Sequence, residues 1–381
     1  MITKFKQLDW WIAGPYLILS VIGIVMVFSA SSNMASGSAM VYLLKQTAFV
    51  GVGIAAIVFL LSLNMQALRR MIATPTVVYL LGGVLLVTEF LPAVNGAHGW
   101  IPLPGFSLQP VEFFKVFLII YIADFMSKHP WQIGRGLTQQ SLFQPSRNHA
   151  FWPILGSFGL IFIYPDLGNL FITGVIVLVL LLLSGMRRWW AFIVSAGALI
   201  LGFLLPKVLA LLHLNGASHY QLGRLTAFVN PWENADAGHQ LIIAYYAIAH
   251  GGLFGVGLGN SILKQGYLPE PNTDFIMAVM VEELGAVLTT VVLLLEFLLI
   301  WRIMLLGIRQ SQQFYRLLLF GLATFLFVQI LVNFGGVLGI LPITGVTFPF
   351  ISYGGSSFLV LSIAVGLALN ISNRRKKVGG G

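Results

Sequence analysis

The sequence predicts an all-α polytopic membrane protein, built as one bundle of about ten transmembrane helices. Three observations lead to this prediction. Hydrophobic residues make up 58% of the 381 residues and charged residues only 9%, with a mean hydropathy of +0.91. A soluble domain carries about 25% charged residues, because its surface must meet water. Apolar runs recur along the chain, and Lys and Arg are distributed asymmetrically around them. The composition therefore excludes a water-soluble enzyme and a disordered protein.

The apolar runs are long enough to cross the roughly 30 Å hydrocarbon core of a bilayer. Pro165 and Gly168 interrupt the runs near 150–184, which form either two short spans or one broken helix. The first run follows Lys4 and Lys6 as a signal peptide would, but its length and the lack of a soluble segment after it indicate an uncleaved span. The predicted spans are 10–29, 43–63, 73–92, 110–127, 150–164, 168–184, 187–207, 275–301, 315–337 and 353–372.

Positive charges orient the spans. If the N-terminus is cytoplasmic, 16 of the 21 Lys and Arg residues fall on the cytoplasmic side, as expected for inner loops. Both termini are therefore predicted in the cytoplasm, which requires an even number of spans. Segments 93–109 and 338–352 then face outside, together with a large loop between spans 7 and 8, residues 207–274. Within this loop, 240–250 predicts a short helix at the outer leaflet. The whole chain, 1–381, is predicted to be one membrane domain.

Several kinds of site are not expected. The net charge of +9 is spread over the loops without a basic stripe, so a nucleic-acid partner is not predicted. Cys is absent, which excludes disulfides and thiol chemistry. The seven His residues have no paired spacing of metal ligands, so no metal-binding residues are predicted.

Charged residues inside spans are the first candidates for function, because each costs roughly 2.5–3.5 kcal/mol at a helix centre. Glu112 and Lys115 are three residues apart and share a helix face. They form either a structural ion pair or the polar wall of a substrate cavity. Glu282 and Glu283 face different sides of the eighth span, so at most one of them can share a cavity with Glu112. Glu296 lies deeper in that span and is expected to be structural.

Asp274 follows two prolines, at 269 and 271, that stiffen the approach to the eighth span. Asn272 or Thr273 is expected to cap this helix, which would put Asp274 in the first turn. There the helix dipole favours an ionised carboxylate. A carboxylate on a rigid mount at the outer membrane boundary suits a general base. The alternative is an ordinary helix start with a favourable charge.

Five groups of residues resemble the SEDS family (shape, elongation, division and sporulation), in family order across nearly the whole chain. Segments 342–347 and 267–270 are closer to the division members, FtsW and SpoVE, than to the elongation member RodA. The chain has Val111 where the family usually has Ser or Gly, a departure that leaves the neighbouring acid in place. The groups are 342–357 (PITGVTFPFISYGGSS), 267–276 with 282–285 (YLPEPNTDFI and EELG), 109–115 (QPVEFFK), 165–168 (PDLG) and 223–225 (GRL) with Phe228 and Pro231.

The resemblance implies an inverting peptidoglycan glycosyltransferase that polymerises lipid II at the outer face of the bacterial cytoplasmic membrane, in cell division or cell-shape maintenance. It also implies a class B penicillin-binding protein as partner, with other divisome or elongasome membrane proteins. Asp274 matches the family's proposed catalytic acid and Trp100 its outer-loop tryptophan. The residues expected at the substrate are Trp100, Glu112, Lys115, Asp166, Arg224, Lys264, Glu270 and Ser356.

The chemistry of this reaction needs one base, because a pyrophosphate leaves without taking up a proton. Lys115, Arg224 and Lys264 are candidates for stabilising the negative charge that develops on it. A divalent cation, Mg²⁺ or Mn²⁺, could do the same. Two other functions stay open at this point. One is a lipid II flippase, which would use the same intramembrane charges, and the other is a scaffold that only recruits the transpeptidase.

Overall fold

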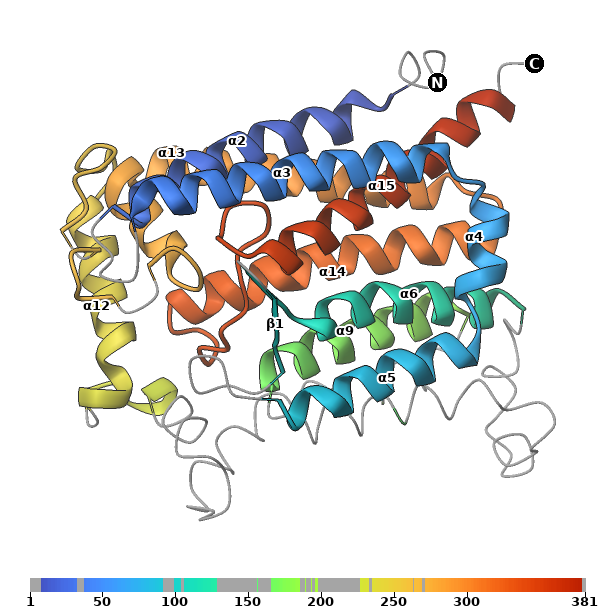
Figure 1. Cartoon of the computed structure of the whole chain (residues 1–381), viewed down its shortest axis with the longest axis horizontal. Coiled ribbons are helices and arrows are strands. Elements are labelled where there is room, and N and C mark those ends of the chain that lie inside the picture. The colour runs from blue at the N-terminus through green and yellow to red at the C-terminus, as the bar shows by residue number, and fades with distance from the viewer. Residues whose placement is uncertain are drawn as a thin grey trace.

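The protein is a bundle of long helices that run side by side (Figure 1). The computed structural model describes residues 8–32, 38–91, 99–103, 106–128, 156, 166–185, 189, 193, 196–197, 227–232, 235–262, 264–268 and 271–378. Its elements are α2 (Trp10–Ala30), α3 (Ala39–Ser62), α4 (Met65–Ile72), α5 (Pro75–Glu89), β1 (Ile101–Leu103), β2 (Phe106–Leu108), α6 (Pro110–Lys128), α9 (Leu167–Leu183), α12 (Ala235–Gly251), α13 (Ile276–Ile308), α14 (Gln313–Val337) and α15 (Gly355–Val378).

Five of these helices, α2, α3, α13, α14 and α15, are long and apolar enough to cross a membrane. Helices α4 and α5 meet at a 62° bend and together make a sixth candidate, while α9 is a shorter apolar helix. The chain is thus a multi-pass helical membrane protein, as its composition predicts. Eight of the ten predicted spans coincide with described helices. Those at 150–164 and 187–207 lie almost entirely outside the described residues, so the count of ten stays a prediction.

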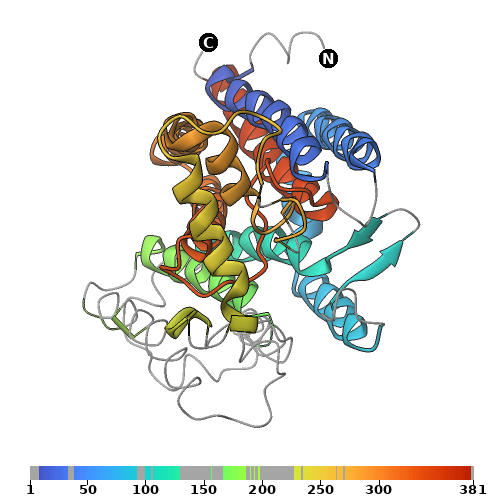
Figure 2. The same ribbon diagram turned by 90° about the vertical axis from the view of Figure 1, so that its left-hand side faces the viewer.

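The two ends of the bundle differ. The start of α2 and the end of α15 lie at one end, and α12 crosses the other (Figures 1 and 2). Two ion pairs join separate helices. Arg302 Nη2 of α13 lies 2.8 Å from Oδ2 of Asp9, the N-cap of α2, and Arg69 Nε of α4 lies 2.5 Å from Asp124 Oδ1 of α6. The helix predicted within 240–250 is present as α12, longer than expected.

Helix α13 is broken at Gly285, whose φ of 80° and ψ of 169° are not helical. Residues 282–287 on either side of the break pair with residues 252–257 through four main-chain hydrogen bonds of 2.9–3.1 Å. The segments approach so closely that a Cβ on Gly285 would lie 2.5 Å from the carbonyl oxygen of Leu253. In a bilayer, freed backbone groups need protein partners. The break therefore separates a buried half-helix, residues 276–283, from the rest of α13.

Two shorter segments complete the bundle. Residues 338–354 fold back between α14 and α15, and the buried ring of Phe350 packs edge-on against Tyr16 at 5.4 Å. Strands β1 and β2 form an antiparallel hairpin beside the helices (Figure 2). The sequence predicted only an outer loop here. The Phe106 ring on β2 contacts Phe49 of α3, 5.9 Å between centroids, and so holds the hairpin to the bundle.

Candidate active site

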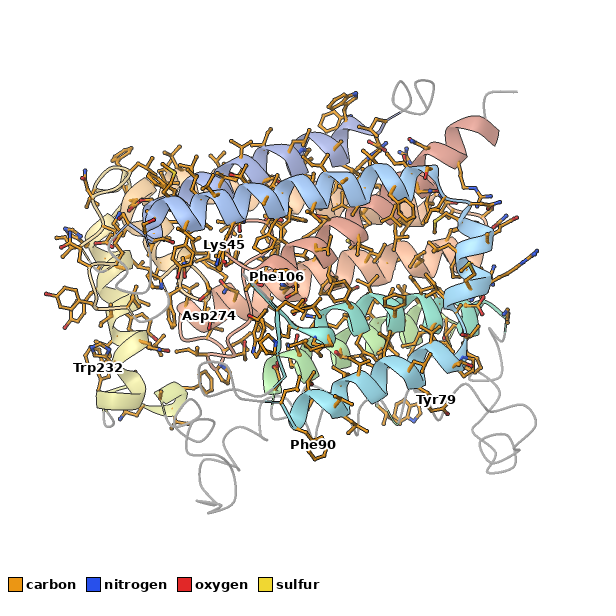
Figure 3. The ribbon with its side chains drawn as sticks, in the orientation of Figure 1. Lys45, Tyr79, Phe90, Phe106, Trp232 and Asp274 are labelled. Carbon is orange, nitrogen blue, oxygen red and sulfur yellow. The ribbon has the colours of Figure 1, made fainter. Side chains whose placement is uncertain are left out.

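Asp274 lies in the turn before α13, toward the end of the bundle that α12 crosses (Figure 3). The N-cap of α13 is Phe275, which makes no side-chain capping hydrogen bond. The expected cap by Asn272 or Thr273 is therefore wrong, and Asp274 precedes the first helical turn. Asn272 Nδ2 instead donates to Ser31 Oγ at the end of α2 (3.1 Å), and Asn272 Oδ1 accepts no hydrogen bond among the described residues. Asp274 still lies next to the positive end of the helix dipole.

A pocket opens beside Asp274 (the Asp274 pocket). The turn of Asp274 and Phe275 forms one wall, the last turns of α14 with Asn333 form a second, and residues 343–346 form a third. Asp274 itself is half-buried. A carboxylate in this position can accept a proton from a group that enters the pocket, provided that the group comes within about 2.6–3.2 Å.

A row of buried polar groups joins α6 to the start of α9. Lys115 Nζ donates to Glu112 Oε1 (2.7 Å) and to Asn169 Oδ1 (2.8 Å). Asp166 is the N-cap of α9: its carboxylate accepts from the Asn169 main chain (2.9 Å) and from Asn169 Nδ2 (2.6 Å). The structure thus brings together three predicted residues, Glu112, Lys115 and Asp166, through a fourth that the sequence analysis missed. The spacing of three residues from the N-cap was the signal that could have identified Asn169.

Lys115 and Glu112, which form an ion pair, differ in how many of their hydrogen-bonding groups have partners. Lys115 Nζ has two oxygen partners and lies 4.9 Å from the centre of the Phe325 ring. Glu112 Oε2 is buried and, within the described part of the chain, accepts no hydrogen bond. A buried carboxylate oxygen without a partner costs free energy, because it has given up its hydrogen bonds to water. Glu112 Oε2 can therefore accept a hydrogen bond from a ligand.

Close packing connects this polar row to the Asp274 pocket. A Cβ on Gly168, in the first turn of α9, would lie 2.6 Å from Thr344 Cβ. Thr344 is one of the residues that line the pocket. Only a glycine allows the start of α9 to approach the 343–346 wall this closely. The start of α9, which carries part of the polar row, therefore packs directly against the 343–346 wall of the pocket.

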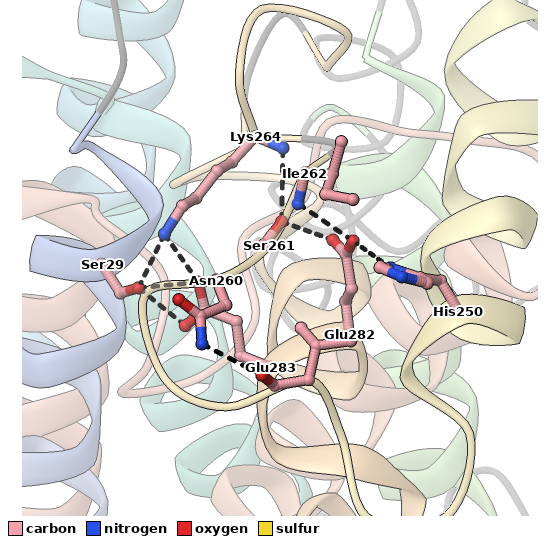
Figure 4. A network of polar contacts seen from close by, with 9 residues as sticks. Ser29, His250, Asn260, Ser261, Ile262, Lys264, Glu282 and Glu283 are labelled. Carbon is pink, nitrogen blue, oxygen red and sulfur yellow. Dashed lines mark hydrogen bonds and ion pairs between the residues drawn. The ribbon is translucent and has the colours of Figure 1, made fainter.

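Two acids of α13, Glu282 and Glu283, belong to a separate network (Figure 4). Glu282 is buried, where its carboxylate accepts from the main-chain N–H of Ile262 (3.1 Å), binds the Ser261 hydroxyl and pairs with His250 Nδ1 (2.9 Å). These partners tie α12 and the segment after it to the half-helix that follows Asp274. No contact of Glu282 with Glu112 occurs among the described residues.

Glu283 faces the opposite way, as expected for adjacent helical residues. It accepts from Lys264 Nζ (2.7 Å) and from Ser29 Oγ of α2 (2.6 Å), and both charged side chains are fully buried (Figure 4). Lys264 was predicted to stabilise charge on a substrate. In the structure its ammonium binds Glu283 of α13 and Ser29 of α2, and Lys264 is not among the residues that line the Asp274 pocket.

The other predicted residues are placed as follows. Trp100 is half-buried, directly before β1. Ser356 is buried in the first turn of α15. Arg224 and Glu270 lie outside the described residues. Glu296 is fully buried, and neither of its carboxylate oxygens is hydrogen bonded within the described ranges. Across those ranges, no three His, Asp or Glu side chains gather as metal ligands.

Comparison with known proteins gives consistent results. A sequence profile of the cell cycle protein family of FtsW, RodA and SpoVE matches residues 10–377. The chain is 40% identical to the probable peptidoglycan glycosyltransferase FtsW of Lactococcus lactis, over 99% of this chain and 95% of the relative. It is 34% identical to stage V sporulation protein E of Bacillus subtilis, over 98% and 99%.

Solved structures agree with these relatives. A chain from a peptidoglycan synthase complex that coordinates polymerization and crosslinking superposes with a TM-score of 0.74 at 27% identity, covering 97% of this chain and 98% of the other. The rod shape determining protein RodA of Thermus thermophilus superposes with a TM-score of 0.66 at 25% identity, covering 97% of both chains. Profile, sequence and fold all match over nearly the full length, and the chain therefore belongs to the FtsW/RodA/SpoVE family of cell cycle proteins.

Proposed function

We propose that this protein is a peptidoglycan glycosyltransferase that polymerises lipid II into glycan strands, with Asp274 as the general base. The names of the relatives support the activity. The observation that carries the assignment of the base is that Asp274, a half-buried acid, lines a pocket formed by a turn, a helix end and a loop. Trp100 and Glu270 stay candidates for substrate contacts on the strength of the family resemblance alone.

In the proposed reaction, the 4-hydroxyl of the acceptor sugar attacks C1 of the donor sugar. Asp274 takes the hydroxyl proton as the new C–O bond forms, and the bond from C1 to undecaprenyl pyrophosphate breaks. The pyrophosphate leaves with the electron pair of that bond and needs no proton. One base is therefore sufficient, and configuration at C1 inverts. A well-placed general base typically contributes about 10²–10⁴-fold in rate.

The polar row of Glu112, Lys115, Asp166 and Asn169 is proposed to bind the polar head of the substrate. Lys115 is the cation of this row, and Arg224 is a further candidate for the pyrophosphate. Mg²⁺ and Mn²⁺ sites commonly combine one or two carboxylates with substrate phosphates. If the reaction uses such an ion, Glu112 Oε2 is the carboxylate oxygen of this row with unused capacity to hold it.

The proposed setting is the cytoplasmic membrane of a bacterium, with ten spans in a single domain, both termini inside, and the 207–274 loop outside. The charge asymmetry of the sequence supports this orientation. The match to a chain of a peptidoglycan synthase complex supports a class B penicillin-binding protein as partner. The FtsW-named relatives and the 342–347 segment favour a role in division, within a divisome of other membrane proteins.

Purified protein given fluorescent lipid II tests the proposal against its rivals. A polymerase makes glycan chains, and more of them when the class B partner is added. A flippase moves the label across liposomes without making chains, and a scaffold does neither. Chain-free scrambling would replace the proposed activity with transport.

A further inference from the structure

The main-chain carbonyls of residues 272, 273 and 274 each accept a hydrogen bond from a donor that lies outside this turn. The turn has no regular helix or strand structure, and the helix it precedes has no side-chain cap. Its position therefore depends on these outside donors, which come from α14 and from the segment before α15. Tyr353 N donates to Asn272 O (2.8 Å), Ser352 Oγ donates to Thr273 O (2.6 Å), and Asn333 Nδ2 donates to Asp274 O (2.9 Å).

Asn333 contacts two walls of the Asp274 pocket through its side-chain amide. The residue is 5% exposed, and its Nδ2 donates a second hydrogen bond to Val346 O (2.7 Å). Asp274 and Val346 lie on different walls of the Asp274 pocket. One amide therefore links the wall that carries the carboxylate to the wall formed by 343–346, and both of its N–H groups are used.

We infer that Asn333, supported by Ser352, is the positioning residue that fixes the Asp274 carboxylate relative to the rest of the pocket. This inference rests on the proposed role of Asp274 as base. Asn333 touches the main chain of Asp274 and not the reacting atoms, so it acts through Asp274. A displacement of about 1 Å at a catalytic group can cost about 10²-fold in rate. Loss of the Asn333 amide releases both walls at once.

Gln329 provides a matched control on the same helix. It lies one turn before Asn333 on α14 and is also buried. Its amide donates to Thr347 O (3.2 Å) and Ser357 Oγ (3.2 Å), so it anchors the same returning segment. Neither of these bonds reaches Asp274. If Asn333 served only to hold the segment in place, Gln329→Ala and Asn333→Ala would have similar effects.

The experiment compares Asn333→Ala with Gln329→Ala in purified full-length protein, by steady-state polymerisation of lipid II. The expected result for Asn333→Ala is a kcat lowered about 10–100-fold with KM within about threefold of the parent. Gln329→Ala is expected to keep kcat within about threefold. Equal losses in the two variants, or a parental kcat in folded Asn333→Ala, would overturn the inference.

Folding and the base assignment are controlled separately. Thermal unfolding in detergent identifies a variant that fails to fold. If Asn333→Ala does so, Ser352→Ala decides, because it removes the hydrogen bond to Thr273 O from another element, and a parental kcat there overturns the inference. Asp274→Asn tests the base itself. An inactive Asp274→Asn beside a fully active Asn333→Ala rejects the positioning role alone, whereas an active Asp274→Asn rejects the base.

Discussion

Asp274 is the residue whose removal should change the rate most and the fold least. Asp274→Asn is expected to lose about 10²–10⁴-fold in polymerisation, which is about 3–5.5 kcal/mol of barrier. The side chain precedes the helix, where a carboxylate contributes only about 0.3–1 kcal/mol through the dipole. The variant should therefore express and bind its transpeptidase partner. Asp274→Glu should retain a trace of activity, because the base survives but moves.

The measurement is polymerisation of labelled lipid II by each purified variant. Glu270→Gln, four residues earlier, is the internal control and should be milder. If Asp274→Asn polymerised within a few-fold of the parent, the base would have to be sought elsewhere. Asp166 and Glu112, the carboxylates of the neighbouring polar row, would be the next candidates.

Glu112 and Lys115 are expected to serve the substrate as well as each other. Lys115→Met should destabilise more than Glu112→Gln, because it removes the only hydrogen-bond donor that contacts Glu112 among the described residues, whereas Lys115 keeps Asn169. Breaking a buried pair costs about 3–5 kcal/mol. The double variant should recover thermal stability, yet stay inactive in lipid II polymerisation. Near-normal activity of the double variant would mean that the pair is only structural.

At the scale of elements, the break in α13 depends on one residue. The φ and ψ of Gly285 fall in a region that other residues essentially never adopt. Gly285→Ala should therefore lower thermal stability by at least about 1–3 kcal/mol of backbone strain, with a further cost because its Cβ meets the 252–257 segment. Loss of activity should follow, since the half-helix that follows Asp274 would shift.

Gly51→Ala on α3 is the matched control for this prediction. A Cβ there meets nothing within 4 Å, and the backbone is helical. Alanine should be neutral or stabilise by about 0.4–1 kcal/mol. Thermal unfolding of both variants in the same detergent compares them directly. Equal melting temperatures for Gly285→Ala and the parent would contradict the role given to the break.

At the scale of the whole molecule, the end crossed by α12 is expected to face outside the cell. The chain has no Cys, so single cysteines report accessibility without background. Gln265→Cys, exposed in the segment after α12, should react with an impermeant maleimide in intact cells. Ser311→Cys, exposed between α13 and α14, should react only after the membrane is opened. The reverse pattern would invert the orientation predicted from the Lys and Arg distribution.

Composition and hydrophobic pattern were enough to predict the features that depend on whether a residue contacts lipid, water or its own helix. A chain with 58% hydrophobic residues has to be folded within a bilayer, where only helices or closed barrels satisfy the backbone. The Glu112–Lys115 contact also followed from sequence, because three residues along a helix always share a face. Predictions of this kind succeed because they rest on local geometry or on burial alone.

Contacts between distant segments could be decided only by the tertiary structure. Adjacent acids at 282 and 283 look equivalent in sequence, yet one binds His250 and the other Lys264. The Asn272 amide, expected at the start of α13, donates to Ser31, 241 residues away. Asn333 meets Asp274 across 59 residues. No local pattern encodes such partners, because each hydrogen bond forms only after packing has removed water from both groups. The sequence thus determined a helical membrane bundle and its candidate charges, and the fold decided which of those charges share a site.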